Sequence, residues 1–157
     1  MYKRQDRTRE IVKLAGMQGL RLLEADRLEM DRIAHSTNHQ GIILKVQPYQ
    51  YHSLQELVER AEKKARAMEA ADSDSARINA RPLFIALDGV TDPQNLGAVI
   101  RSAAAFGANG VILPERRSAS VTAAAWKVSA GAAAHLPVAR VVNLNTVSYT
   151  HLTLPTS

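Results

Sequence analysis

The sequence contains no cysteine, which excludes disulfide bonds, thiolate metal sites and cysteine nucleophiles. Aromatic residues make up only 4% of the chain, so its core has to be built from aliphatic side chains and alanine. No apolar run approaches membrane-spanning length, and the first residues, MYKRQDRTREIVKLAG, lack the apolar core of a secretory signal. These absences favour a reducing compartment, and we expect a cytoplasmic protein with no membrane partner.

Basic residues outnumber acidic ones in the 157-residue chain. With 20 lysines and arginines against 15 aspartates and glutamates, the formal net charge is +5. A positive surface favours polyanionic partners, of which nucleic acid is the commonest. Charge alone is equally compatible with a basic protein that has no such partner.

The pattern of apolar residues divides the chain into three zones. Residues 6–52 combine apolar residues at helical spacing with a strand signal, HQGIILKVQPY. Residues 53–81 open with Ser53 and Glu56 at the spacing of a capping box, which predicts a helix, and continue into a polar linker. Residues 82–146 alternate strand and helix patterns, which predicts an α/β fold with a parallel sheet.

The stretch LDGVTDPQNLGAVIRSAAAFGANGVIL, residues 87–113, carries the clearest functional signal. It predicts a buried strand, a turn at Asp92 and an alanine-rich helix with a single arginine, Arg101. Ligands of open parallel sheets gather beyond the carboxyl ends of the strands, where this turn is expected. We predict that Asn95 caps the helix and that Gly97, one turn before Arg101, leaves room for a ligand. The alternative is purely structural, with a turn and a solvated helix face.

Two kinds of site lack support in the sequence. There is no phosphate loop and no GxGxxG pattern, so nucleotide hydrolysis and ordinary dinucleotide binding are not indicated. The five histidines show no metal-ligand spacing, and we expect no metal.

The segment DPQNLGAVIRSAAAFG closely resembles the first signature motif of the SpoU (TrmH-type) RNA 2′-O-ribose methyltransferases. The resemblance continues through GVILPERRSASVTAAAWKVSAGAAAHLPVARVVNL. Upstream, NHQGIILKVQPYQYHSLQELVERA is similar to the end of the family's L30e-like RNA-binding domain. The nearest subgroup is the bacterial enzyme that methylates a guanosine ribose in large-subunit (23S) ribosomal RNA. The resemblance implies an α/β fold: part of a knotted SPOUT-type methyltransferase domain, preceded by the rear part of the L30e-like domain and homodimeric in the complete protein.

The resemblance also implies a reaction, the transfer of a methyl group from S-adenosylmethionine to a ribose 2′-hydroxyl of RNA. A neutral hydroxyl is a poor nucleophile, so its proton has to be removed or strongly polarised. The family arginine corresponds to Arg101 and the family asparagine to Asn95, and we predict both as catalytic. Because arginine stays protonated, Arg101 is expected to polarise the hydroxyl and hold the adjacent phosphate rather than act as a base. Asn95 would hold the turn and the substrate in register.

Five further residues are predicted to bind RNA. Arg116, Arg117 and Lys127 follow the second expected strand and could contact phosphates, or could equally lie on a solvated loop and helix face. His39 and Gln40 belong to the HQG of the upstream segment, where a role in a turn is favoured over contact with RNA.

Three residues of the expected helix SVTAAAWKVSAGAAA are assigned structural roles. Trp126 is predicted to lie in the core or at a dimer interface rather than to stack on a base. Ser129 and Gly131 are predicted to allow close helix packing.

The family pattern stops near Asn145. The glycine-rich Ser-Glu loop and the Ser-Leu-Asn segment, which build most of the family's cofactor pocket, are absent from the sequence, so no cofactor-binding residue is assigned. Residues 1–5 and 147–157 are interpreted as artefacts, and the chain as a fragment that is inactive as it stands. Two alternatives are a non-catalytic RNA-binding module without the cofactor site and an unrelated α/β domain with a fortuitous Asp-Pro-x-Asn turn.

Overall fold

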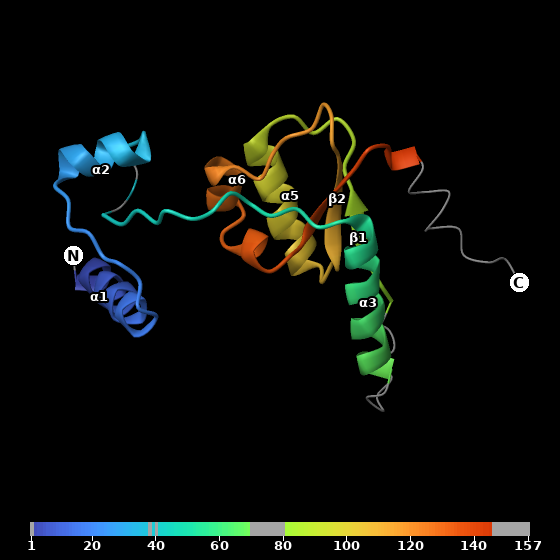
Figure 1. Ribbon diagram of the computed structural model, residues 1–157, viewed down its shortest axis with the longest axis horizontal. Helices are drawn as coiled ribbons and strands as arrows, with labels where there is room; N and C mark the ends of the chain where they lie inside the picture. Colours follow the sequence, from blue (N-terminus) through green and yellow to red (C-terminus); the bar gives the residue numbers. More distant parts are fainter. Residues whose placement is uncertain (1, 38, 40, 70–80, 146–157) are drawn as a thin grey trace, which may run out of the picture. The chain divides into compact units, whose positions relative to one another are not determined.

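The computed structural model describes residues 2–37, 39, 41–69 and 81–145 (Figure 1). The chain divides between Gln47 and Pro48 into two compact units. None of the helices in the described ranges combines the length and the apolar character that a membrane span requires.

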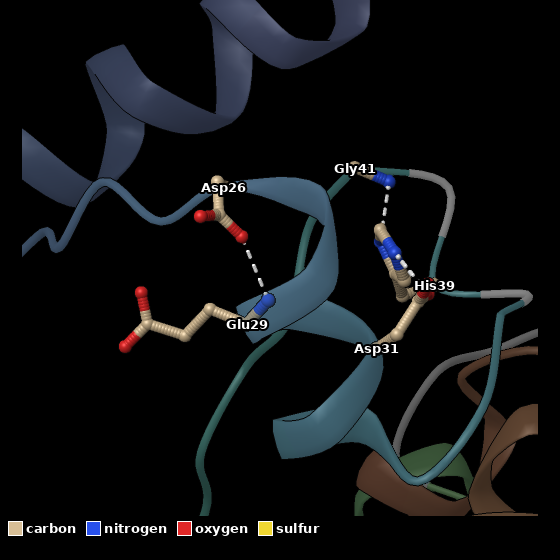
Figure 2. Close-up of polar contacts among 5 residues, drawn as sticks. All are labelled: Asp26, Glu29, Asp31, His39 and Gly41. Atoms are coloured by element: carbon tan, nitrogen blue, oxygen red, sulfur yellow. Dashed lines mark hydrogen bonds and ion pairs between the residues drawn. The ribbon is translucent and has the colours of Figure 1, made fainter.

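The first unit contains two helices, α1 (Tyr2–Met17) and α2 (Arg27–Ala34). Asp26 caps α2, because its carboxylate accepts a hydrogen bond from the backbone N–H of Glu29 at 2.8 Å (Figure 2). The helix ends at His35, which takes a left-handed backbone conformation with φ of 48°. Local hydrogen bonds therefore define both ends of α2.

The strand predicted from HQGIILKVQPY is wrong. Residues 42–48 belong to no helix or strand, and the side chains of Leu44 and Val46 are 73% and 60% exposed. A strand is stabilised by its ladder to a neighbour, and no neighbouring strand lies beside this segment in the part of the chain that the structure describes. The apolar alternation of the segment is therefore not sufficient to make it a strand.

The second unit is built on a parallel sheet, which confirms the predicted fold class. Its strands β1 (Phe84–Ala86), β2 (Gly110–Pro114) and β3 (Val138–Val141) lie in the order β1-β2-β3. Ile85 pairs with Val111, and Ile112 pairs with Ala139. The helix α5 (Pro93–Ala105) connects the first two strands, and α6 (Ala123–Val128) lies between β2 and β3.

Helices cover both faces of this sheet (Figure 1). Successive side chains of a strand point to opposite faces, so Val111 and Leu113 join one core and Ile112 joins the other. The first core includes Leu96 and Ile100 of α5 together with residues of α6. The second includes Leu57 of α3 (Leu54–Glu69). The unit therefore has three layers, with the carboxyl ends of all three strands at one edge.

The predicted capping box at the start of α3 is confirmed. The Ser53 hydroxyl accepts from the Glu56 N–H at 3.2 Å, and the Glu56 carboxylate accepts from the Ser53 N–H at 2.8 Å. The hydrogen bonds from the backbone and side chain of Ser53 hold the pKa of Glu56 below its usual range. Most of the polar linker that follows α3 lies outside the described residues.

The single helix predicted over SVTAAAWKVSAGAAA is wrong, because the structure breaks it in two. The helix α6 ends at Val128, and a short 3-10 helix, η1, covers Ala132–Ala134. Gly131 lies between them with a φ of 90°, a conformation that favours glycine. A Cβ added there would meet nothing within 4 Å, so the packing role predicted for Gly131 is also wrong. The break arises from the backbone conformation.

Candidate functional site

Asp92, not Asn95, caps α5, so the N-cap prediction for Asn95 is wrong. The Asp92 carboxylate accepts from the Gln94 N–H at 2.9 Å, and the Asp92 carbonyl accepts from the Leu96 N–H at 3.0 Å. Pro93 occupies the first helical position, where its fixed φ and missing N–H are tolerated, and this starts the helix early. Asn95 consequently lies inside the first turn with an exposed side chain.

Gly97 serves helix packing rather than ligand access, so that prediction is also wrong. The residue is buried, and a Cβ added to it would lie 2.4 Å from the Ala125 carbonyl oxygen and 3.0 Å from the Val128 Cβ. The face of α5 that carries Gly97 is therefore covered by α6.

Arg101 lies on the exposed side of α5. Within the part of the chain that the structure describes, its guanidinium has no hydrogen-bond or ion-pair partner. Its helical neighbours three residues before and four residues after are alanines, Ala98 and Ala105, so small side chains flank the guanidinium. It remains accessible to a ligand for this reason and not because of Gly97.

Asn95 and Arg101 are on one helix but are separated along it. Six residues at 1.5 Å each place them about 9 Å apart along the axis. At about 100° per residue their side chains also point about 120° apart around the axis, so a ligand that touches both has to reach along and around α5. Both residues stay predictions as catalytic groups.

The loop after β2 carries Arg116 and Arg117, both exposed. The N–H of Ala119 in this loop donates to the Val90 carbonyl at 2.7 Å, which joins the loop to the turn that follows β1. Because the strands are parallel, the two arginines lie at the same sheet edge as the turn before α5. Lys127 is exposed in the last turn of α6. The RNA-binding roles of these three residues stay predictions.

His39 is held within the first unit by both ring nitrogens (Figure 2). Its Nδ1 accepts from the Gly41 N–H at 3.0 Å, and its Nε2 lies 3.1 Å from the Asp31 carboxylate. An accepting Nδ1 places the proton of the neutral ring on Nε2, which donates to Asp31. The side chain is only 9% exposed. The turn role predicted for His39 is confirmed, and its contact with RNA stays a prediction. Gln40 lies outside the described residues.

The structural roles predicted for Trp126 and Ser129 are confirmed. Trp126 is partly buried against the first core, with its ring edge-on to Tyr49 at a centroid distance of 6.2 Å. Ser129 is fully buried, and its hydroxyl donates to the Trp126 carbonyl at 2.8 Å and accepts from the Ala133 N–H at 3.3 Å. His135 is exposed and ends η1.

A cluster around Tyr49, Tyr51 and Arg140 was missed from the sequence. Both tyrosine hydroxyls accept hydrogen bonds from backbone N–H groups of the second unit, and the Arg140 guanidinium lies 4.1 Å above the Tyr51 ring. Burial raises the pKa of Tyr49. The available signal is the spacing of PYQYH, which places the two tyrosines on one side of an extended segment. Their partners are distant in sequence and carry no pattern.

The candidate site contains nothing that resembles a metal centre. Among the described residues, no group of three or more histidine, aspartate or glutamate side chains could hold a metal ion. Its functional groups are cationic and amide side chains, which bind anions and hydroxyls.

Two family models match the chain. Residues 82–151 match the SpoU rRNA Methylase family, and residues 2–52 match the family described as RNA 2′-O ribose methyltransferase substrate binding. The chain belongs to the SpoU methylase family. The resemblance predicted from DPQNLGAVIRSAAAFG is confirmed, and the turn before α5, α5 itself and the loop after β2 all lie in the SpoU-matched segment.

The similar curated proteins are longer than this SpoU chain. An uncharacterized tRNA/rRNA methyltransferase of Mycolicibacterium vanbaalenii is 50% identical over 139 residues, which are 88% of this chain and 40% of that protein. A protein of the same description from Mycobacterium sp. (strain KMS) is 47% identical over 140 residues, 89% of this chain and 40% of that protein. The SpoU chain thus spans 40% of the length of these relatives.

A solved structure shares the fold. The AdoMet bound rRNA methyltransferase from Sinorhizobium meliloti matches with a TM-score of 0.60 at 22% sequence identity, over 92% of this chain and 47% of that one. At this identity the likeness concerns the fold alone, and it agrees with the parallel α/β sheet of the SpoU chain.

Proposed function

We propose that this chain is part of an RNA 2′-O-ribose methyltransferase that uses S-adenosylmethionine. The observation that carries the proposal is an exposed Arg101 with no partner in the described structure, placed on α5 within the SpoU-matched segment. The match of residues 2–52 to a substrate-binding family for RNA 2′-O ribose methylation supports the 2′-hydroxyl as the acceptor. The proposed substrate is a guanosine of 23S ribosomal RNA, and the proposed working form is a cytoplasmic homodimer.

Arg101 acts on the RNA in this mechanism. Its guanidinium donates hydrogen bonds to the phosphate next to the target ribose and to the ribose 2′-oxygen. Positive charge beside that oxygen stabilises the negative charge that develops as its proton leaves, and the adjacent phosphate accepts the proton. When bound, S-adenosylmethionine would supply the methyl group from its sulfonium, and the carbon–sulfur bond would break as the 2′-oxygen takes the methyl carbon.

Asn95 positions the substrate by contacting a different group of the RNA from the one that Arg101 contacts. Its amide can donate to a phosphate oxygen or a ribose and accept from a hydroxyl, which a purely cationic side chain cannot do. Because the two residues lie about 9 Å apart along α5, they contact different groups of the same RNA segment. This separation would hold the target ribose in register beside Arg101.

The proposal assigns residues of this chain to the RNA only. The glycine-rich Ser-Glu loop and the Ser-Leu-Asn segment expected to hold S-adenosylmethionine are absent from the sequence. No residue of this chain is therefore assigned to the cofactor.

Arg116, Arg117 and Lys127 extend the positive surface beyond the reacting nucleotide. All three side chains are exposed, so they can neutralise phosphates without first breaking an internal contact. Contacts of this kind supply affinity and register rather than sequence selection. Guanosine selection is assigned to the first unit, residues 1–47, which contains His39 and Gln40; we call it the substrate-binding unit after the family model that matches it.

The proposal is tested by locating the methyl group. The protein expressed from the complete gene is incubated with methyl-labelled S-adenosylmethionine and either 23S ribosomal RNA or transfer RNA, and the RNA is hydrolysed in alkali. Alkaline cleavage requires a free 2′-hydroxyl, so a 2′-O-methylated nucleotide survives as a labelled dinucleotide. We expect labelled dinucleotides that contain methylated guanosine from 23S RNA. Label on a base would overturn the proposal, and RNA binding without any label would favour the non-catalytic module.

A further inference from the structure

We infer that the segment that joins the two units is anchored by Tyr49, Tyr51 and Arg140. Only residues 42–48 then act as the free tether of the substrate-binding unit. We call these three residues the tyrosine anchor. The substrate-binding match extends to residue 52, yet the chain divides into compact units before Pro48. Residues 48–52, the last of the substrate-binding match, therefore lie in the second compact unit.

Hydrogen bonds attach this segment to the sheet. The Tyr49 hydroxyl accepts from the Val138 N–H at 2.9 Å, and the His52 N–H donates to the Val138 carbonyl at 3.0 Å. His52 also forms a parallel bridge with Ala139, so the segment lies alongside β3. This single bridge extends the sheet beyond its β3 edge.

The second hydroxyl reaches the entry to α6. The Tyr51 hydroxyl accepts from the Val121 N–H at 2.8 Å. Val121 is 6% exposed and Val138 is fully buried, so without these hydroxyls neither N–H would have its acceptor. A buried donor left without an acceptor costs about 1–3 kcal/mol, which makes the contacts selective for tyrosine over phenylalanine.

Arg140 closes the anchor from β3. Its guanidinium lies 4.1 Å above the Tyr51 ring, and its Nη2 donates to the Ser120 hydroxyl at 2.7 Å. Its Nε is buried with no hydrogen-bond partner within the described residues. A partly desolvated cation over an aromatic face strengthens the attraction to that ring. Arg140 therefore contacts the Tyr51 ring directly, in addition to the Ser120 hydroxyl.

The anchor sets the length of the free tether. His39 is fixed in the first unit by Asp31 and Gly41, and Tyr49 is fixed in the second, which leaves residues 42–48 between them. Seven residues at 3.3–3.6 Å each span at most about 25 Å. Release of the anchor would free the chain as far as His52, and eleven residues span at most about 39 Å. The local concentration of the substrate-binding unit would fall about twofold, because it scales with the −3/2 power of tether length.

The anchor itself is tested by amide hydrogen exchange on the full chain. We expect the wild-type amides of His52, Val121 and Val138, which donate the hydrogen bonds that hold this segment, to exchange at least ten times more slowly than those of residues 43–47. The Y49F/Y51F double variant keeps both rings in the core and should lose this protection, as should R140A, whereas R140K retains the cation and should restore most of it. The matched control is Q50A, because the Gln50 side chain is exposed and, within the described ranges, donates only to the Pro48 carbonyl. Equal exchange of these two groups of amides in the wild type, or unchanged protection of the Val121 and Val138 amides in the double variant, overturns the inference.

The consequence for RNA delivery rests on the proposed function and has its own measurement. In the protein from the complete gene, Y49F/Y51F should raise the KM for RNA about twofold and leave kcat unchanged. A Gly-Ser-Gly-Ser insertion after Gln47 adds the same four residues to the tether with the anchor intact, and should raise KM equally. If the insertion and the double variant both leave KM unchanged, the anchor does not control reach. If the wild type transfers no methyl group, the proposed function fails while the exchange result still decides the anchor.

Discussion

Replacement of Gly97 by alanine should loosen the packing of α5 on α6. The new Cβ would lie 2.4 Å from the Ala125 carbonyl oxygen and 3.0 Å from the Ala125 Cα. Both are backbone atoms, which cannot move aside as the end of a flexible side chain can, so the two helices must separate. The substitution is therefore a direct probe of how closely α5 and α6 approach each other.

Two opposing effects set the magnitude of this change. Alanine in place of a helical glycine gains about 1 kcal/mol of helix propensity. Overpacking of a close contact costs about 1–3 kcal/mol, and a rigid backbone neighbour places this case at the upper end. The expected result is a net loss of about 1–2 kcal/mol from the free energy of unfolding. For a unit of this size that corresponds to a fall of roughly 5–10 °C in Tm.

Fluorescence of Trp126 provides the assay, because the chain has one tryptophan and it lies in α6. Thermal and urea unfolding of G97A are compared with those of S102A, an exposed change on the same helix. G16A in α1 is the matched glycine-to-alanine control, since a Cβ there meets nothing within 4 Å, and it should raise helicity. If G97A is as stable as S102A, the close approach of α5 and α6 is refuted.

Three further predictions follow from single contacts. Because the pKa of Glu56 is lowered, the capping box stabilises α3 fully above the ordinary glutamate pKa, and this stabilisation is lost as the pH falls through the lowered pKa. Helicity measured against pH should show this loss in the wild type and not in E56Q. Substitution of Gly131 by alanine should destabilise the second unit by about 1–2 kcal/mol in urea unfolding, because its φ of 90° strains any other residue, and equal stability would contradict the backbone account of the break. Removal of Arg116 or Arg117 should make the negative slope of log K for RNA against log salt shallower by about 0.7–0.9 each. An unchanged slope would exclude the removed arginine from phosphate contact.

Local sequence patterns predicted much of the fold. The run GVILP predicts β2 because branched apolar residues between a glycine and a proline suit a buried parallel strand, and the structure has β2 at these residues. Ser53 and Glu56 predicted the start of α3 because a capping box depends only on groups three residues apart. Features that depend on such short separations can be read from the chain itself.

Features that depend on distant contacts could not be predicted. The role of Gly97 is set by Ala125, which is close in space only after α6 has packed. Tyr49 and Tyr51 accept hydrogen bonds from residues 89 and 70 positions away, so their spacing alone does not identify a partner. The N-cap was misassigned for a different reason, since Pro93 and Asp92 both favour an earlier helix start and outweigh Asn95. The arginine of the candidate site was identified by its family motif rather than by its spacing.

The most direct test of the account is the rate of RNA methylation by R101A in the protein from the complete gene. Loss of one preorganised charge at a reacting oxygen costs about 10²–10³ in kcat, and we expect a fall of that size with the KM for S-adenosylmethionine unchanged. R66A is the charge-matched control, because Arg66 is an exposed arginine on α3 whose one ion-pair partner among the described residues is Glu62 at 3.5 Å. It should keep the wild-type rate. An R101A protein that folds normally and methylates the RNA ribose as fast as R66A would contradict the central claim.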